Sequence, residues 1–118
     1  MKYALLAYSA LAARDRTPAQ ARREIPADIA AVLARPEVAG WIRLQDVESA
    51  TTVRNEEGNT LLTDGPFVDS KEFLGGLIIV EADNLDGALA VAAELQKATR
   101  FGGAIEVRPI LEQELGGA

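Results

Sequence analysis

Two runs of the sequence are too apolar to belong to a sheet that faces water on one side. Residues 2–9 read KYALLAYS and residues 74–82 read LGGLIIVEA. A strand buried on both faces shows a continuous apolar run of this kind, whereas a half-exposed strand alternates apolar with polar residues. We therefore expect both segments to be central strands of a sheet whose two faces are covered.

The segment after the first run predicts a helix that is interrupted by a proline. Residues 17–20 read TPAQ, in which threonine caps the helix, proline takes the first helical position and glutamine completes a capping box. Pro26 lacks an amide donor, so it kinks this helix or divides it in two. Four apolar residues fit one helix face across the break: Ile25, Ile29, Val32 and Leu33.

The remaining segments predict further strands and a second helix. Residues 41–47 alternate in character, as strands do, and residues 51–54 and 60–63 flank a polar turn as a hairpin. One of residues 83–84 caps a helix with a clear apolar stripe. Residues 104–110 alternate again and predict the last strand.

This order of elements is the split β-α-β arrangement of a ferredoxin-like α+β domain. At 118 residues the chain has the length of a single domain over residues 1–118. The arrangement predicts an antiparallel sheet with helices on one face only. The sequence holds no further layer for the other face, so we expect a second copy to cover it and the protein to be a homodimer.

The charge balance excludes several classes of partner. Lysine and arginine number 12 against 18 aspartates and glutamates, which gives a net charge of −6. Such a surface repels phosphate backbones and anionic lipids, so neither nucleic acid nor a membrane is expected as a partner. Tyr3, Tyr8 and Ser9 interrupt the opening apolar run, which is interpreted as a strand rather than a signal peptide and predicts a cytoplasmic protein.

The absence of two residue types excludes common catalytic machinery. The sequence has no cysteine and no histidine. Disulfides, thiolate nucleophiles, cysteine zinc sites, imidazole metal ligands and the Ser-His-Asp triad are therefore excluded. Asp64 and Asp69 are two carboxylates at a spacing that matches no recognised cation loop, so we predict neither a metal nor a cofactor.

One stretch of the chain resembles a known family. Residues 63–76 read TDGPFVDSKEFLGG, and their DGPF tetrapeptide at 64–67 is the namesake of the DGPF family within the YCII-related superfamily. KYALLAY at 2–8 is similar to the first strand of that family, ATTVR at 50–54 to its hairpin and EVRP at 106–109 to its last strand. The resemblance covers nearly the whole chain.

The resemblance implies a fold and a range of functions. It implies a dimeric α+β barrel, in which two ferredoxin-like sheets pack face to face with a cleft in each protomer or between them. It also implies enzyme-like chemistry by a histidine–aspartate pair in the cleft, or an association with extracytoplasmic-function sigma factors. Histidine is absent here, so Asp64 is the polar motif residue that carries over.

Asp64 has two interpretations. As the first residue of a turn it accepts backbone hydrogen bonds, while Gly65 and Pro66 shape the bend and Phe67 anchors the loop in apolar surroundings. As a catalytic residue it lies at a strand end facing the cleft, where desolvation by apolar neighbours suits it to act as a general base. The sequence leaves both interpretations open.

Arginines in the predicted strands are candidate ligand contacts. Alternation places Trp41 and Arg43 on one face, and we expect the helices to cover the opposite face. Arg108 likewise shares a face with Glu106, away from the helices. Both arginines would then point into the barrel, where each pairs with Glu106 or Asp64 or binds a carboxylate or enolate ligand in a bidentate manner.

We therefore expect a cytoplasmic protein that binds a small anionic organic molecule in a cleft near Asp64. Arg43 and Arg108 would bind this ligand together with the Tyr8 hydroxyl, unless Tyr8 only packs in the core. Asp64 would supply acid–base catalysis of the lyase, isomerase or hydrolase type. The alternative is a non-enzymatic interaction protein that uses its outer helical faces, with sigma-factor regulation as the role that the resemblance implies.

Overall fold

A four-stranded antiparallel sheet forms the centre of the protein. The computed structural model describes residues 1–9, 25–68, 71–98 and 103–114. The sheet has the order β2-β5-β1-β6, so the two runs with the most apolar sequences, β1 and β5, are its central pair. Its strands are β1 (Lys2–Ser9), β2 (Val38–Arg43), β5 (Phe73–Glu81) and β6 (Ala104–Pro109).

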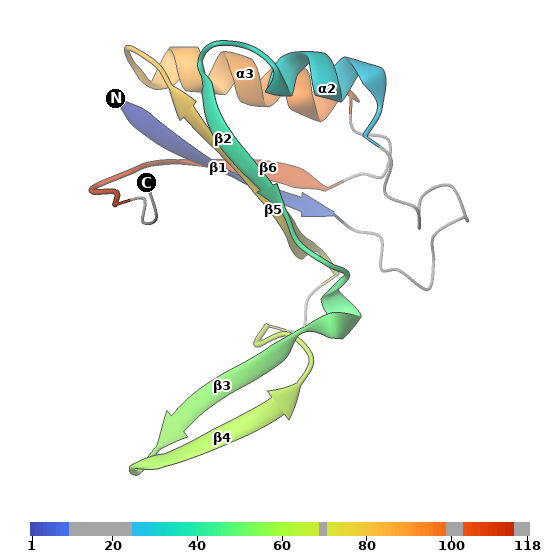
Figure 1. The fold of residues 1–118 in the computed structure, drawn as a ribbon, viewed down its shortest axis with the longest axis vertical. Coiled ribbons are helices and arrows are strands. Elements are labelled where there is room, and N and C mark those ends of the chain that lie inside the picture. The colour runs from blue at the N-terminus through green and yellow to red at the C-terminus, as the bar shows by residue number, and fades with distance from the viewer. Residues whose placement is uncertain (10–24, 69–70, 99–102, 115–118) are drawn as a thin grey trace.

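Two helices, α2 (Ala27–Leu33) and α3 (Leu85–Ala98), cover one face of this sheet (Figure 1). The strand order and the single helical layer confirm the ferredoxin-like α+β fold. α2 begins directly after Pro26, which is its N-cap residue. The helix start predicted at residues 17–20 lies outside the described residues. Asn84 caps α3, because its Oδ1 accepts a hydrogen bond from a backbone amide of the first turn at 3.1 Å.

The core lies between the helices and the face of the sheet that they cover. Tyr3 and Leu5 of β1 stand opposite Val80 and Ile78 of β5 in the register. The exposed fraction of Leu5 and of Val80 is 0%, and full burial of such a side chain stabilises the fold by about 1.5–3 kcal/mol. The buried helix residues are Val32 of α2 and Ala88, Val91, Ala92 and Leu95 of α3.

Neither α2 nor α3 covers the opposite face of the sheet, which is called the open face below (Figure 1). Alternation along the central strands pairs Ala4 with Ile79 and Leu6 with Leu77 on this face, and all four are half-buried. The helices of the single chain therefore account for the apolar side chains of β1 and β5 on one face of the sheet, but not for those on the open face. The open face also carries Tyr8, Ile42, Glu106 and Arg108.

A hairpin, called the arm below, projects from one end of the sheet (Figure 1). It consists of β3 (Thr51–Glu56) and β4 (Asn59–Asp64), which form a separate two-stranded sheet. Every residue of these strands is exposed except Thr52, which is half-buried. The predicted hairpin is confirmed, and both of its strands are longer than predicted.

The path from the main sheet into the arm differs from the prediction. The strand predicted over residues 41–47 runs from Val38 to Arg43 instead. A 3-10 helix, η2 (Val47–Ser49), follows it and leads into β3. The backbone amide of Leu44 still donates to the Gly75 carbonyl at 2.8 Å, so the chain leaves the sheet just beyond this bond.

Candidate functional site

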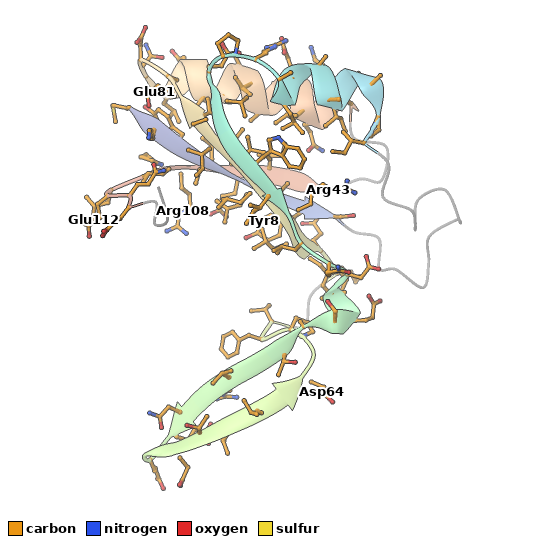
Figure 2. The ribbon with its side chains drawn as sticks, in the orientation of Figure 1. Tyr8, Arg43, Asp64, Glu81, Arg108 and Glu112 are labelled. Atoms are coloured by element: carbon orange, nitrogen blue, oxygen red, sulfur yellow. The ribbon has the colours of Figure 1, made fainter. Side chains whose placement is uncertain are left out.

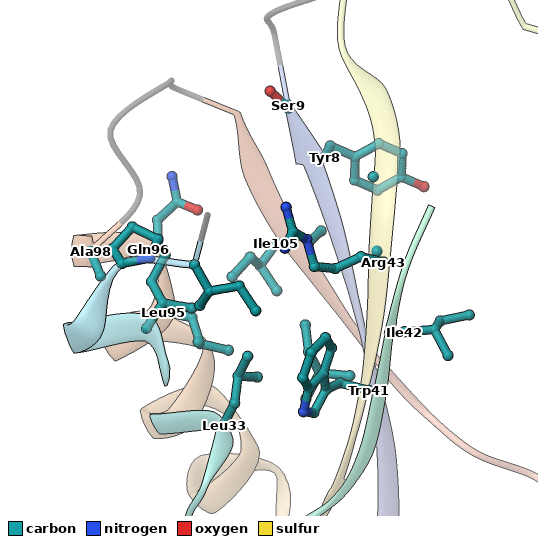
Figure 3. A pocket seen from close by; sticks show the side chains of 17 residues that line it. Tyr8, Ser9, Leu33, Trp41, Ile42, Arg43, Leu95, Gln96, Ala98 and Ile105 are labelled. Carbon is teal, nitrogen blue, oxygen red and sulfur yellow. The ribbon is translucent and has the colours of Figure 1, made fainter. Parts of the chain in front are cut away.

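A cleft of about 250 Å³ lies between the two helices and the sheet (Figure 3). Its walls are mostly apolar. Ile29 and Leu33 of α2 form the helical side together with Leu95 of α3, and Trp41 and Ile105 belong to the sheet side. Ser9, Arg43 and Gln96 add polar groups to the lining.

Trp41 and Arg43 come to the cleft from the same strand. Residues two apart on a strand point to the same face, and Trp41 is the partner of Ile78, whose side chain is buried in the core. Figure 3 shows Trp41 and Arg43 on the helix side of the sheet and Ile42 on the other side. The prediction that Arg43 points away from the helices is therefore wrong.

The orientation of β2 differs from the prediction because the strand turns its largest apolar side chain toward the helices. The indole of Trp41 has more apolar surface than an isoleucine side chain, and it lines the cleft beside the helices with an exposed fraction of 43%. Arg43 follows Trp41 to that side, whereas Ile42 stays 55% exposed on the open face. In β6 the prediction is confirmed, because Ile105 packs against the core and Arg108 lies on the open face.

The cleft combines apolar walls with one cationic side chain among its described residues. Of the described residues that line it, Arg43 alone is charged. Gln96 lies at the same cleft, and its Nε2 donates a hydrogen bond to the Gly103 carbonyl at 3.1 Å. Arg43 is exposed, and the planar fork of donors on its guanidinium matches a carboxylate in a bidentate manner. The cleft is thus suited to a molecule with an apolar body and an acidic group.

Tyr8 lies between this cleft and a second hollow. It borders the cleft, but Figure 3 shows its ring on the other side of the sheet from Trp41, with the hydroxyl directed away from Arg43. The second hollow, of about 870 Å³, lies between the end of the open face and the base of the arm. Its lining includes Tyr8, Leu44, Pro66, Phe67, Leu74 and Glu106.

Asp64 ends β4 at the base of the arm and is exposed. Gly65 follows it with a φ of +100°, a backbone conformation that favours glycine. The Gly65 amide donates to the Ala50 carbonyl at 2.8 Å, and the Thr52 hydroxyl donates to the Gly65 carbonyl at 2.8 Å. The Gly65 backbone therefore closes the base of the arm.

Phe67 does not anchor this loop in apolar surroundings. Its exposed fraction is 73%, and the Arg54 guanidinium carbon lies 5.7 Å from the centre of its ring. This cation–π contact joins the loop after Asp64 to β3 of the arm. The expectation that Phe67 anchors the loop in apolar surroundings is wrong, because its side chain is mostly exposed beside the arm.

The single chain does not bring the four predicted site residues together. Figure 2 shows Asp64 on the arm, well separated from Tyr8, Arg43 and Arg108 on the main sheet. The Nε of Arg108 lies 3.6 Å from Glu106 Oε2, so the predicted pairing with Glu106 is confirmed. Neither Asp64 nor Arg108 lines either of the two hollows described here.

The comparison with known families decides where this chain belongs. The family model of the YCII-related domain matches residues 1–114. The chain belongs to the YCII-related family. An uncharacterized protein of Rhizobium meliloti (strain 1021) is 32% identical over 114 residues, which cover 93% of this chain and 92% of that protein.

Glu81 of this YCII-related protein has a shifted pKa outside both hollows. The Met1 amine donates a hydrogen bond to Glu81 Oε1 at 2.9 Å, and this bond lowers the pKa of the carboxyl from its usual 4.5. Both groups are exposed. The pair ties the first residue to the end of β5.

Sequence reasoning missed several residues of the cleft in this YCII-related protein. The sequence places Trp41 in a strand and Leu95 on the apolar stripe of the second helix. It does not predict that the two residues line one cleft. A lone tryptophan two residues before an arginine was the available signal. Among the described residues, no cluster of three acidic side chains could hold a metal ion. Within the same residues, none of the helices has the length and apolar character needed to cross a membrane.

Proposed function

We propose that this YCII-related protein is a cytoplasmic protein that binds a small organic anion in the cleft between the helices and the sheet. The placement of Trp41 and Arg43 next to each other in an otherwise apolar cleft supports this proposal. The apolar body of the ligand would pack against Trp41, and its acidic group would bind the Arg43 guanidinium. The binding site is thus proposed at Arg43 rather than near Asp64.

The size and lining of the cleft narrow the class of ligand. A volume of about 250 Å³ lies just below the usual range for small-molecule sites, which is about 300–1,000 Å³. One aromatic ring or a short acyl chain with a carboxylate fits this space, whereas a nucleotide or a sugar phosphate does not. The apolar walls also disfavour a highly hydroxylated ligand, because its hydroxyl groups would lose water without replacement.

Trp41 provides a direct test of the proposal. The sequence holds a single tryptophan, so its fluorescence reports on the cleft alone. We would titrate the protein with benzoate, phenylacetate and hexanoate, and with the matched neutral amides. The acids should change the fluorescence in a saturable manner and bind about tenfold or more tightly than the amides, because a hydrogen bond to a charged group contributes about 1.5–3 kcal/mol. Absence of a saturable change with all three acids would overturn the proposal.

A second candidate function is protein interaction through the outer surface of α3. Leu85 and Leu89 of this helix are 46% and 44% exposed, and exposed apolar side chains favour contact with another protein. An extracytoplasmic-function sigma factor is the partner that the sequence resemblance implies. Binding of a purified sigma factor that is lost in Leu89→Lys would support this function, and binding of equal strength in this variant would exclude the α3 surface.

A further inference from the structure

We propose that the ligand of the cleft carries a hydrogen-bond donor opposite its acidic group, as a para-hydroxylated aromatic acid does. The inference rests on the proposed function, because it takes the acidic group to bind Arg43. It adds a second contact, in which the side-chain oxygen of Gln96 accepts a hydrogen bond from the ligand. Gln96 is half-buried and lines the same cleft.

A backbone carbonyl fixes the orientation of the Gln96 amide. The Nε2 of Gln96 donates a hydrogen bond to the Gly103 carbonyl at 3.1 Å. A carbonyl oxygen only accepts hydrogen bonds, so the opposite orientation of the amide would place two oxygens against each other. The Oε1 therefore turns away from Gly103, and Figure 3 shows it on the side of the amide toward Arg43.

The backbone of Gly103 is itself held in place. Its φ is +93°, and a Cβ at this position would overlap the carbonyl oxygen of Tyr8 at the end of β1. The carbonyl that orients Gln96 thus belongs to a closely packed segment. A ligand without a donor would cover the Oε1 of Gln96 and remove its water without replacement, which costs free energy. The cleft therefore favours a ligand that brings a donor to this oxygen.

Arg43 and Gln96 lie on opposite sides of the cleft. One row of paired residues crosses the sheet beneath it: Arg43, Gly76, Ala7 and Ile105. Neighbouring strands are about 4.8 Å apart, so the backbones of Arg43 and Ile105 are separated by about 14 Å. Ile105 belongs to β6, which begins directly after Gly103, the partner of Gln96. The guanidinium and the amide oxygen thus approach the cleft from its two ends.

The floor of the cleft between these two ends has small side chains. Gly76 of β5 and Ala7 of β1 occupy the middle of the row, and both line the cleft. They leave room for a flat body between the polar groups, and an aromatic ring packs well against apolar walls such as Trp41 and Leu95. A para substituent points directly away from the carboxylate of such a ring. It is thus the substituent that reaches Gln96 when the acid binds Arg43.

Calorimetry with matched acids tests the inference on the native chain. Both para-hydroxybenzoate and para-aminobenzoate should bind about threefold to tenfold more tightly than benzoate, as expected for one added hydrogen bond. No gain should occur for para-methoxybenzoate, which has no donor, or for ortho-hydroxybenzoate, whose hydroxyl lies beside the carboxylate. Saturable binding of benzoate without a gain for the two para donors would overturn this inference and leave the proposed function standing. Absence of binding by every acid would overturn both.

A pair of glutamine variants tests the assignment of the contact to Gln96. Gln96→Leu removes the acceptor and should bind benzoate and para-hydroxybenzoate with equal affinity. Gln45→Leu is the matched control, because Gln45 is exposed and does not line the cleft, and this variant should keep the preference. A preference that survives in Gln96→Leu would overturn the assignment. The acid series on the native chain decides the question even if Gln96→Leu does not fold.

Discussion

Trp41 and Arg43 occupy successive positions on the helix-facing side of β2, so an indole and a guanidinium border the same cleft. This arrangement is a consequence of strand geometry, because residues two apart on a strand point to the same face. It also couples the only tryptophan of the chain to the charged group that we propose for ligand binding. The fluorescence of Trp41 should therefore change when a ligand binds to the Arg43 guanidinium in the cleft.

Replacement of Arg43 should weaken the binding of acids and leave the binding of neutral amides unchanged. Arg43→Gln removes the charge and keeps much of the side-chain length, so the affinity for benzoate should fall by about tenfold or more. The matched control is Arg108→Gln, since Arg108 lies on the open face and does not line the cleft. Tryptophan fluorescence measures the affinity of each variant for benzoate and for its neutral amide. Equal losses in the two variants would point to net charge rather than to a contact with Arg43.

Replacement of Asp64 should leave ligand binding in the cleft unchanged. Asp64 lies on the arm, far from Arg43 in the single chain, so Asp64→Asn removes no contact with the proposed ligand (Figure 2). If a reaction is found, loss of a positioned acid or base would lower its rate by about 10²–10⁴-fold. Unchanged turnover in Asp64→Asn would exclude Asp64 as the catalytic residue, and a large loss of turnover with unchanged affinity would support that role.

Gly76→Ala should destabilise the fold much more than Gly75→Ala. A Cβ at Gly76 would lie 2.9 Å from the Ile42 carbonyl oxygen, which belongs to the backbone of the neighbouring strand. At Gly75 the nearest atom would be the Ala7 oxygen at 3.8 Å, an ordinary contact. Overpacking at such a site costs about 1–3 kcal/mol. Urea denaturation of both variants measures the free energy of unfolding, and equal stabilities would contradict the close approach of β2 and β5.

The contribution of Glu81 to stability should depend on pH. Its pKa is lowered in the folded protein, so the carboxylate stabilises the fold above the unfolded value of 4.5. This contribution is lost as the pH falls through the folded pKa. Glu81→Gln should therefore melt at a lower temperature than the native chain at pH 7, and the two melting temperatures should converge well below pH 4.5. Glu48→Gln, an exposed carboxylate of η2, is the control, and a Glu81→Gln difference that persists in acid would contradict the prediction.

The secondary structure and the fold could be predicted because they depend on local patterns. The apolar runs of β1 and β5 and the stripe of α3 each follow from the period of their own element. The split β-α-β order then restricts the topology to a few arrangements. The family resemblance carried by DGPF at residues 64–67 agrees with the YCII-related domain found over residues 1–114.

The site could not be predicted to the same degree because it depends on long-range packing. Alternation showed that Trp41 and Arg43 share a face, but the choice between the two faces depends on what the rest of the sheet buries. The hairpin was visible in the sequence, yet nothing local indicated that it leaves the main sheet. Its departure separates Asp64 from Tyr8 and Arg108, which the sequence alone had grouped in one cleft.

The arm leaves the outer edges of its two strands unpaired in the described structure, which affects how the protein behaves at high concentration. Each of its strands pairs with one neighbour, so the outer edges of β3 and β4 present backbone groups that other strands can pair with. These edges lie beside exposed apolar side chains such as Val53 and Leu62, a combination that promotes aggregation. The yield of soluble protein should therefore depend on how these strand edges are kept from pairing with other chains, as well as on the stability of the core.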